Sequence, residues 1–128
     1  MLKVRTPREM NETFARAFNS RSIDNLLALY EPTAVLRNDG TGKSLTGQNE
    51  IATGLQELLQ APGTMVSKNN FCIEHDGLAL LRADWALVGD YEAVIASGSS
   101  AEVVRRQTDG SWLYIIDHAA GASLPRII

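Results

Sequence analysis

The sequence predicts an α+β fold in which three N-terminal helices pack on a mixed, mainly antiparallel β-sheet. Apolar residues recur at helical spacing between residues 6 and 62, whereas from Thr64 onward they fall in long β-rich runs. Short turns separate these runs, at Asp76-Gly77, Gly89-Asp90 and Asp109-Gly110. Helices followed by consecutive strands with short connections are typical of the α+β class.

Each expected helix has a start signal and one apolar stripe. Thr6-Pro7-Arg8-Glu9 is typical of a helix start, with Thr6 at the N-cap. Ser22 caps a shorter second helix, which Pro32 ends, and a third helix follows Thr46-Gly47. The stripes consist of Met10, Phe14, Ala17 and Phe18 in the first helix, Ile23, Leu26, Leu27 and Tyr30 in the second, and Ile51, Leu55, Leu58 and Leu59 in the third.

The expected strands are one short strand and four longer ones. They cover residues 34–36, 64–75, 77–88, 91–106 and 111–118. The Gly and Ser residues at 97–100 indicate a bulge or bend, which a strongly curved sheet needs. Within 77–88 one face carries Ala79, Leu81, Ala83, Trp85 and Leu87, and the other carries Leu80, Arg82, Asp84 and Ala86. We expect the first face to meet the helices and the second to form a subunit interface.

Composition and charge exclude several classes of protein. The chain has 128 residues, which suits one domain over 1–128 with a sizeable core. Its net charge of −3 argues against nucleic-acid binding, and no apolar run approaches the roughly 20 residues of a membrane span. The N-terminus has no apolar signal region and Cys72 is the only cysteine, so we expect a cytoplasmic protein.

Several segments together resemble the nuclear transport factor 2-like superfamily, and more narrowly its bacterial SnoaL-like and ketosteroid-isomerase-like members. They are residues 22–32 (SIDNLLALYEP), 34–36, Leu45-Thr46-Gly47, 77–81 with Asp84-Trp85, and 101–112 (AEVVRRQTDGSW) with Ile116-Asp117. The resemblance implies a cone-shaped, cystatin-like barrel whose concave sheet face lines a ligand cavity. It does not fix a reaction, because this scaffold hosts isomerases, cyclases, dehydratases and binding modules.

The resemblance also allows three family positions to be compared. Phe14 falls where the ketosteroid isomerases carry the oxyanion-hole tyrosine, Asn38 falls at their proton-shuttling aspartate, and Glu102 falls at their neutral aspartic acid. Phe14 cannot donate a hydrogen bond, and Asn38 cannot accept a proton at neutral pH. Steroid isomerisation by the family's usual route is therefore not expected.

Glu102 and Asp117 are the candidate catalytic residues. The resemblance to the ketosteroid isomerases also implies that Leu113, Ile115 and Asp117 lie on the concave face beside Glu102, Val104 and Arg106. Two acids in an apolar cone repel each other and are desolvated, which raises at least one pKa and gives an acid/base pair. The alternative is an ion-pair network in which Arg106 or Arg37 neutralises both acids. A bulge at Gly110 would instead place Asp117 on the opposite face.

The remaining candidates form the wall of the cavity or the convex face. The expected ligand-binding residues are Phe14, Phe18, Tyr30, Asn38, Trp85, Val104 and Ile115. Trp85 suits core packing or ligand stacking, and Tyr30, at a helix end, offers a hydroxyl or is purely structural. No pair of His, Asp, Glu or Cys has a metal-ligand spacing, so we expect no metal and no cofactor.

These observations lead to two hypotheses of different kinds. The first is a protein that binds a small, mostly apolar molecule and isomerises, cyclises or dehydrates it by acid/base chemistry. The second is a non-catalytic ligand-binding or association module. In both we expect a homodimer through the convex face, whose residues are Arg82, Asp84, Arg105, Trp112, Tyr114 and His118.

Overall fold

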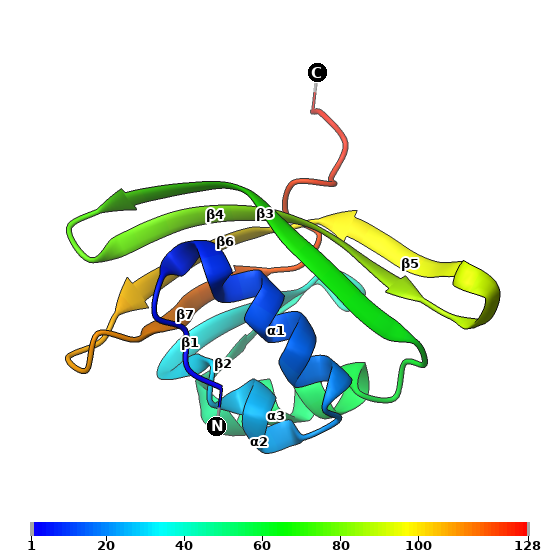
Figure 1. The fold of residues 1–128 in the computed structure, drawn as a ribbon, viewed down its shortest axis with the longest axis horizontal. Coiled ribbons are helices and arrows are strands. Elements are labelled where there is room, and N and C mark those ends of the chain that lie inside the picture. The colour runs from blue at the N-terminus through cyan, green and yellow to red at the C-terminus, as the bar shows by residue number, and fades with distance from the viewer. Residues whose placement is uncertain (1, 128) are drawn as a thin grey trace.

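The computed structural model describes residues 2–127 and contains three α-helices and a seven-stranded sheet (Figure 1). The helices are α1 (Met10–Asn19), α2 (Ile23–Leu27) and α3 (Gly47–Leu58), with 3-10 turns η1 (Pro7–Glu9) and η2 (Asp90–Glu92). The strands are β1 (Tyr30–Asn38), β2 (Lys43–Thr46), β3 (Thr64–His75), β4 (Leu78–Val88), β5 (Val94–Ser99), β6 (Ala101–Arg106) and β7 (Trp112–His118). No helix within residues 2–127 is long and apolar enough to cross a membrane.

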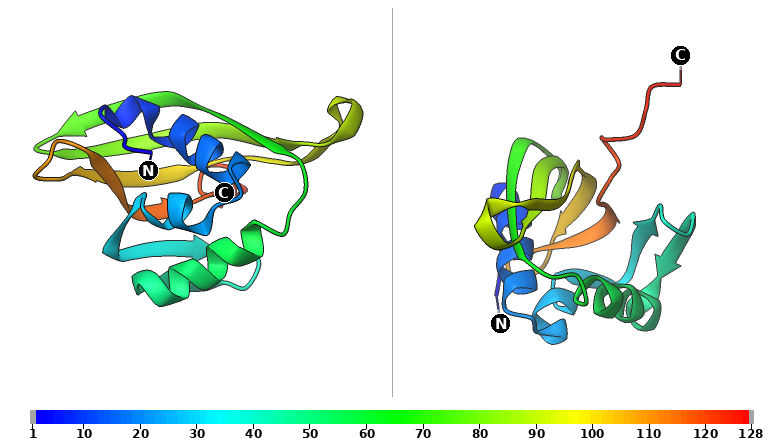
Figure 2. Two further views of the ribbon diagram at one scale, coloured as in Figure 1. Left: turned by 60° about the horizontal axis from the view of Figure 1, so that its bottom comes forward. Right: turned by 90° about the vertical axis from the view of Figure 1, so that its right-hand side faces the viewer.

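The sheet is mixed but mainly antiparallel, as the sequence predicts. Its strand order is β2-β1-β7-β6-β4-β3, and β5 also pairs with β4. Only the pairing of β1 with β7 is parallel among the described ladders. The three helices lie together on one side of the sheet in both views of Figure 2. The parallel pairing places β1, from the first third of the chain, beside β7, the last strand in the described residues.

Two of the expected local signals act as predicted and one does not. The Ser22 side chain caps α2, because its Oγ accepts the Asn25 N–H at 3.2 Å. Pro7 does open the first helical turn, but Thr6 makes no side-chain capping bond. Arg21 takes a left-handed φ of 59° after α1 and donates to the backbone oxygens of Leu59 and Ala61. This arginine thus joins the α1–α2 corner to the end of α3.

The prediction that Tyr30 ends a helix is wrong. Tyr30 begins β1, which continues through Pro32 to Asn38. The register between β1 and β7 shifts between Tyr30 and Val35, so the missing N–H of Pro32 removes no ladder bond. The expected run 91–106 is also two strands, because the chain passes from β5 to β6 at Ser100. Strand β2 was not predicted.

Two neighbouring rows of side chains run across the sheet on opposite faces. The inner row faces the helices and consists of Cys72, Leu81, Glu102, Asp117, Leu36 and Leu45, each paired with the next. The outer row lies on the other face and consists of Ile73, Leu80, Val103, Ile116 and Val35. The predicted inward residues of β4 agree with this assignment, since Ala79, Leu81, Ala83 and Leu87 are buried.

A bulge in β7 reverses the predicted faces of its first half. Glu102 pairs with Asp117 and Val103 with Ile116, but Val104 pairs with Tyr114, so Ile115 is the extra residue. Trp112 and Tyr114 are consequently buried on the helix side of the sheet. The prediction that Leu113 and Ile115 share the face of Asp117 is therefore wrong, and so is the placement of Trp112 and Tyr114 on a convex interface.

Candidate functional site

A cavity of about 400 Å³ lies between the helices and the inner face of the sheet. Most of its wall is apolar, and the main apolar residues are Phe14, Leu36, Leu45, Leu55, Leu58, Met65, Trp85, Leu87 and Ala96. Its buried polar residues gather where β6 and β7 meet α1 and β1, and they are Asn11, Tyr30, Ser67, Ser100, Glu102, Tyr114 and Asp117. Arg37, Asn38, Asp39 and His118 add a second polar group to the wall. The volume is within the usual range for a site that holds a small organic molecule.

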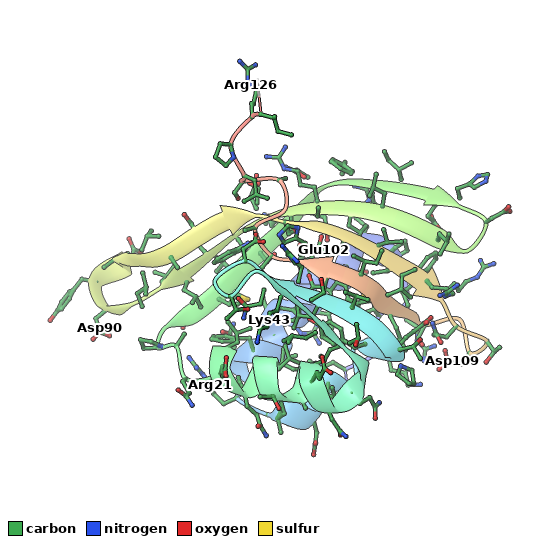
Figure 3. All side chains as sticks on the ribbon, turned by 180° about the vertical axis from the view of Figure 1, so that it is seen from behind. Arg21, Lys43, Asp90, Glu102, Asp109 and Arg126 are labelled. Atoms are coloured by element: carbon green, nitrogen blue, oxygen red, sulfur yellow. The ribbon has the colours of Figure 1, made fainter. Side chains whose placement is uncertain are left out.

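Glu102 and Asp117 lie side by side at the polar end of this cavity. They are direct partners in the β6–β7 ladder, and their residues are 4% and 6% exposed. Figure 3 labels Glu102 near the middle of the molecule, seen from behind. The Tyr30 hydroxyl donates to Asp117 Oδ2, and the Ser100 hydroxyl lies 2.8 Å from Glu102 Oε1. Each acid thus has one buried hydroxyl neighbour from a different strand or loop.

No described cation forms a salt bridge with either acid. Arg106 pairs with Trp112 at the far end of the ladder and is exposed. Arg37 instead contacts Asp39, with 3.4 Å between Nε and Oδ1. The alternative in which Arg106 or Arg37 neutralises both acids does not hold for residues 2–127. The acids face free volume instead.

Burial divides the two acids into a protonated and an ionised member near neutral pH. Desolvation, with repulsion from Asp117, raises the pKa of Glu102 to about 8. Desolvation also raises the pKa of Asp117, to about 6, against the opposing effects of the Tyr30 hydrogen bond and the His118 charge. Near pH 7 Glu102 is therefore mostly protonated and Asp117 mostly ionised, which is the arrangement of an acid beside a base.

Asn11 and Tyr114 complete the polar end, and the sequence analysis did not identify them as site residues. The Tyr114 hydroxyl donates to Asn11 Oδ1, and the Tyr114 ring lies 5.0 Å from the Tyr30 ring centroid. Asn11 is 3% exposed, and its Nδ2 has no hydrogen-bond partner among the described residues. One signal was present in the sequence, because Asn11 precedes Phe14 by one helical turn and so shares its face.

The rim of the cavity is held by two polar contacts and a close approach. His118 Nε2 lies 2.6 Å from Asp39 Oδ2, and this contact lowers the pKa of Asp39. Trp85 Nε1 donates to the Ala119 oxygen at 2.7 Å. A Cβ at Gly98 would come within 2.8 Å of the Trp85 ring, so glycine is required for this packing. His118 is thus a rim residue bonded to Asp39.

The structure brings together most of the predicted site residues but not all of them. Phe14, Tyr30, Asn38, Trp85, Glu102 and Asp117 line the cavity. Phe18 and Val104 do not, because both are completely buried in the hydrophobic core. Ile115 is the bulged residue of β7 and lies off the cavity face. The predicted ligand contacts of Phe18, Val104 and Ile115 are therefore wrong in placement.

The mixed sheet, the helices on one face and the cavity between them define a nuclear transport factor 2-like, or cystatin-like, fold. The SnoaL-like domain model matches residues 11–115, so the chain belongs to the SnoaL-like family. No curated protein matches the sequence. The family expected from the sequence is therefore confirmed.

Solved structures of similar fold share little sequence with the chain. A structure from Thiobacillus denitrificans, assigned as a calcium/calmodulin-dependent protein kinase type II association domain, has a TM-score of 0.78 at 23% identity, over 94% of this chain and 98% of that one. A ketosteroid isomerase-like protein from Erwinia carotovora atroseptica has a TM-score of 0.66 at 18% identity, over 84% and 87%. A protein of unknown function from Shewanella oneidensis has a TM-score of 0.70 at 16% identity, over 88% and 93%. These similarities concern the fold alone.

Proposed function

We propose that this protein binds a small, mostly apolar organic molecule in its cavity and rearranges it by acid/base chemistry, as an isomerase, cyclase or dehydratase. The observation that carries the proposal is the Glu102–Asp117 pair, buried at the end of a mostly apolar cavity with no salt bridge to a described cation. Burying such a pair lowers the stability of the fold, because desolvating a carboxylate opposes folding. Ionisable groups with strongly shifted pKa values in a cavity are therefore candidates for a functional site.

The proposed chemistry assigns one role to each acid. Asp117, the ionised member, takes a proton from a carbon atom of the substrate, and the C–H electron pair moves toward a neighbouring oxygen. Glu102, the protonated member, gives its proton to that oxygen and becomes the carboxylate. Return of the proton from Asp117 to a different carbon, with return of the oxygen's proton to Glu102, gives an isomer and restores both acids. In a dehydration Glu102 instead gives its proton to a leaving hydroxyl group, which departs as water, and the proton that Asp117 took from carbon passes back to Glu102.

Steroid isomerisation by the usual family route remains outside this proposal. Phe14 and Asn38 do line the cavity, but neither side chain can act as an oxyanion donor or base in the required role. The base in the proposed reaction lies on β7, not at the end of β1. The base of the proposed reaction would therefore approach the substrate from a different strand than the base of the ketosteroid isomerases.

Hydrogen exchange of a bound ligand tests this proposal directly. Native mass spectrometry of freshly purified protein is expected to show a co-purified neutral compound. 2-Cyclohexenone and related enones in D₂O are then followed by proton NMR, and we expect faster exchange at carbon with wild type than with Asp117→Asn or Glu102→Gln. Glu12→Gln, on the exposed side of α1, is the matched control and exchanges like wild type. Equal exchange rates with all four proteins, together with the absence of a co-purified ligand, would refute the proposed enzymatic function.

A second function, self-association through the outer row, is favoured by a separate observation. Ile73, Leu80 and Ile116 are 59%, 47% and 47% exposed, and they lie in one continuous row across the sheet. An exposed apolar row of this length is typical of an interface. Arg82, Asp84 and Arg105 lie on the same outer face, and solved structures of similar fold are assigned as association domains. We propose a homodimer through this face.

Light scattering at micromolar concentration tests the dimer. Wild type is expected at twice the chain mass of 13.9 kDa, and Leu80→Asp at the mass of one chain. Gln56→Asp, on the exposed side of α3, is the matched control and keeps the mass of wild type. A monomeric mass for wild type would refute the proposed self-association and would leave the proposal for the cavity unchanged.

A further inference from the structure

Ser100 is a buried serine that interrupts the sheet beside the acid pair. It is 2% exposed, lies between β5 and β6, and lines the cavity. Its backbone N–H donates to the Ala83 oxygen at 2.8 Å, as in a normal ladder. The Ala83 N–H, however, donates to the Ser100 hydroxyl oxygen at 2.9 Å. The serine side chain thus takes the place of a backbone carbonyl at the point where the chain changes from β5 to β6.

The remaining bonding capacity of the Ser100 hydroxyl is directed at Glu102. A hydroxyl has one hydrogen and two acceptor positions, and the Ala83 N–H occupies one acceptor position. Glu102 Oε1 lies 2.8 Å from Oγ, and the Ala83 oxygen lies 3.3 Å from it. The Ser100 hydroxyl therefore has its hydrogen and one acceptor position left to bond with Glu102 and the Ala83 oxygen. The Ala83 oxygen can only accept, whereas Glu102 accepts when ionised and donates when protonated.

We propose that Ser100 is a positioning residue that supports Glu102 in both of its protonation states. When Glu102 is ionised, the Ser100 hydrogen points to Oε1. When Glu102 is protonated, its own O–H donates to the free acceptor position of Oγ, and the Ser100 hydrogen turns to the Ala83 oxygen. Neither arrangement leaves a buried polar atom of this group unpaired, so the proton can leave and return without a desolvation cost at Ser100.

Tyr30 provides the contrasting case at Asp117. Its hydroxyl donates to Asp117 Oδ2, and no second acceptor for that hydrogen lies within bonding range among the described residues. Tyr30 therefore favours the ionised state of Asp117 over the protonated one. The two hydroxyl neighbours assign unequal roles to the two acids, with Asp117 as the resting base and Glu102 as the resting acid. The catalytic meaning of this assignment rests on the proposed function, but the protonation behaviour does not.

Carboxyl titration of the ligand-free protein by carbon-13 NMR tests the inference without any substrate. In Ser100→Ala the ionised Glu102 loses the Ser100 donor and keeps only the smaller stabilisation from the Asn11 side chain, so we expect its titration midpoint to rise by about one pH unit. In Ser100→Thr the hydroxyl remains and the midpoint is expected to stay near that of wild type. Ser111→Ala removes another buried serine hydroxyl, which bonds to Asp109, and is expected to leave the Glu102 midpoint unchanged.

Ser100→Cys replaces Ser100→Ala if the alanine variant does not fold, because the thiol is a weak donor and gives a smaller rise in the same direction. A Glu102 midpoint that is the same with Ala, Cys and Thr at position 100 would overturn the inference. A rise in Ser100→Ala that Thr does not show supports it, even where no exchange of 2-cyclohexenone is ever detected. Failure of the proposed function and failure of this inference are therefore distinguishable.

Discussion

The inner and outer rows of the sheet differ from an ordinary sheet in opposite ways, because the inner row carries acidic side chains and the outer row carries apolar ones. The inner row, at Leu81, Glu102, Asp117 and Leu36, holds two buried acids although it faces the helices. The outer row, at Leu80, Val103, Ile116 and Val35, is entirely aliphatic although it faces outward. An ordinary half-buried sheet has apolar residues inside and polar residues outside. Both departures occur in the same strands, one residue apart.

Each departure has its own physical meaning. Buried acids lower stability unless they meet a cation, become protonated or face a cavity, and here the pKa of Glu102 is raised and both acids face a cavity. Exposed aliphatic side chains in a continuous row gain free energy only when another surface covers them. The inner row thus indicates a ligand site, and the outer row indicates a contact surface. The following predictions test the two rows against each other.

The largest expected effect is a loss of stability as the pH rises. Glu102 titrates near 4.5 in an unfolded chain but near 8 in the folded protein. The folded state therefore binds more protons between these values, and its stability falls as pH increases through that window. With Asp117 included, we expect the free energy of unfolding to fall by about 3–5 kcal/mol from pH 5 to pH 8. Urea melts at several pH values measure this directly.

Glu102→Gln tests whether Glu102 causes the decrease of the free energy of unfolding with rising pH. Gln is neutral throughout, so the loss of stability between pH 6 and pH 8 is expected to disappear in the variant. Glu12→Gln on the exposed side of α1 keeps the wild-type slope. A wild-type curve that is flat from pH 5 to pH 8 would contradict the raised pKa of Glu102.

The second prediction compares one leucine from each row. Leu81 is 0% exposed, so Leu81→Ala is expected to cost about 3 kcal/mol through lost burial and the cavity that remains. Leu80 is the next residue of the same strand, and Leu80→Ala is expected to cost less than about 1 kcal/mol in the monomer. Denaturant melts of both variants at low protein concentration are the measurement. Equal costs would remove the distinction between the two rows.

The smallest expected effect belongs to Asp117→Asn. The amide keeps the shape, accepts the Tyr30 hydrogen bond and removes a buried charge that no described cation balances. We expect the stability at pH 7 to stay equal or to rise by up to about 1 kcal/mol. A loss of several kcal/mol in a thermal or urea melt would show that Asp117 is the anion of an ion pair. The same variant is expected to lower the pKa of Glu102, because the neighbouring charge is gone.

Much of the architecture follows from local signals. The bounds of β3 agree with the predicted 64–75, and the predicted helix at Thr46-Gly47 begins there. Ser22 caps α2 because its hydroxyl reaches a backbone N–H three residues along the chain, which needs no tertiary contact. The strand at Tyr30 was missed for the opposite reason. Its partner is Tyr114, which lies far away in the sequence, and only their pairing makes residues 30–33 a strand.

The sequence by itself determined the alternation of the strands, the family and the presence of two acids on strands that meet. Short-range side-chain periodicity and capping carry that information. The tertiary structure alone decided which residues accompany the acids. The extra residue Ile115 turns Trp112 and Tyr114 inward, and a bulge is set by how two strands twist and pack, not by the residue that bulges. The contacts of Asn11 with Tyr114 and of Ser100 with Ala83 depend on long-range packing in the same way, because these partners meet only when α1 packs on the sheet and β4 pairs with the β5–β6 junction.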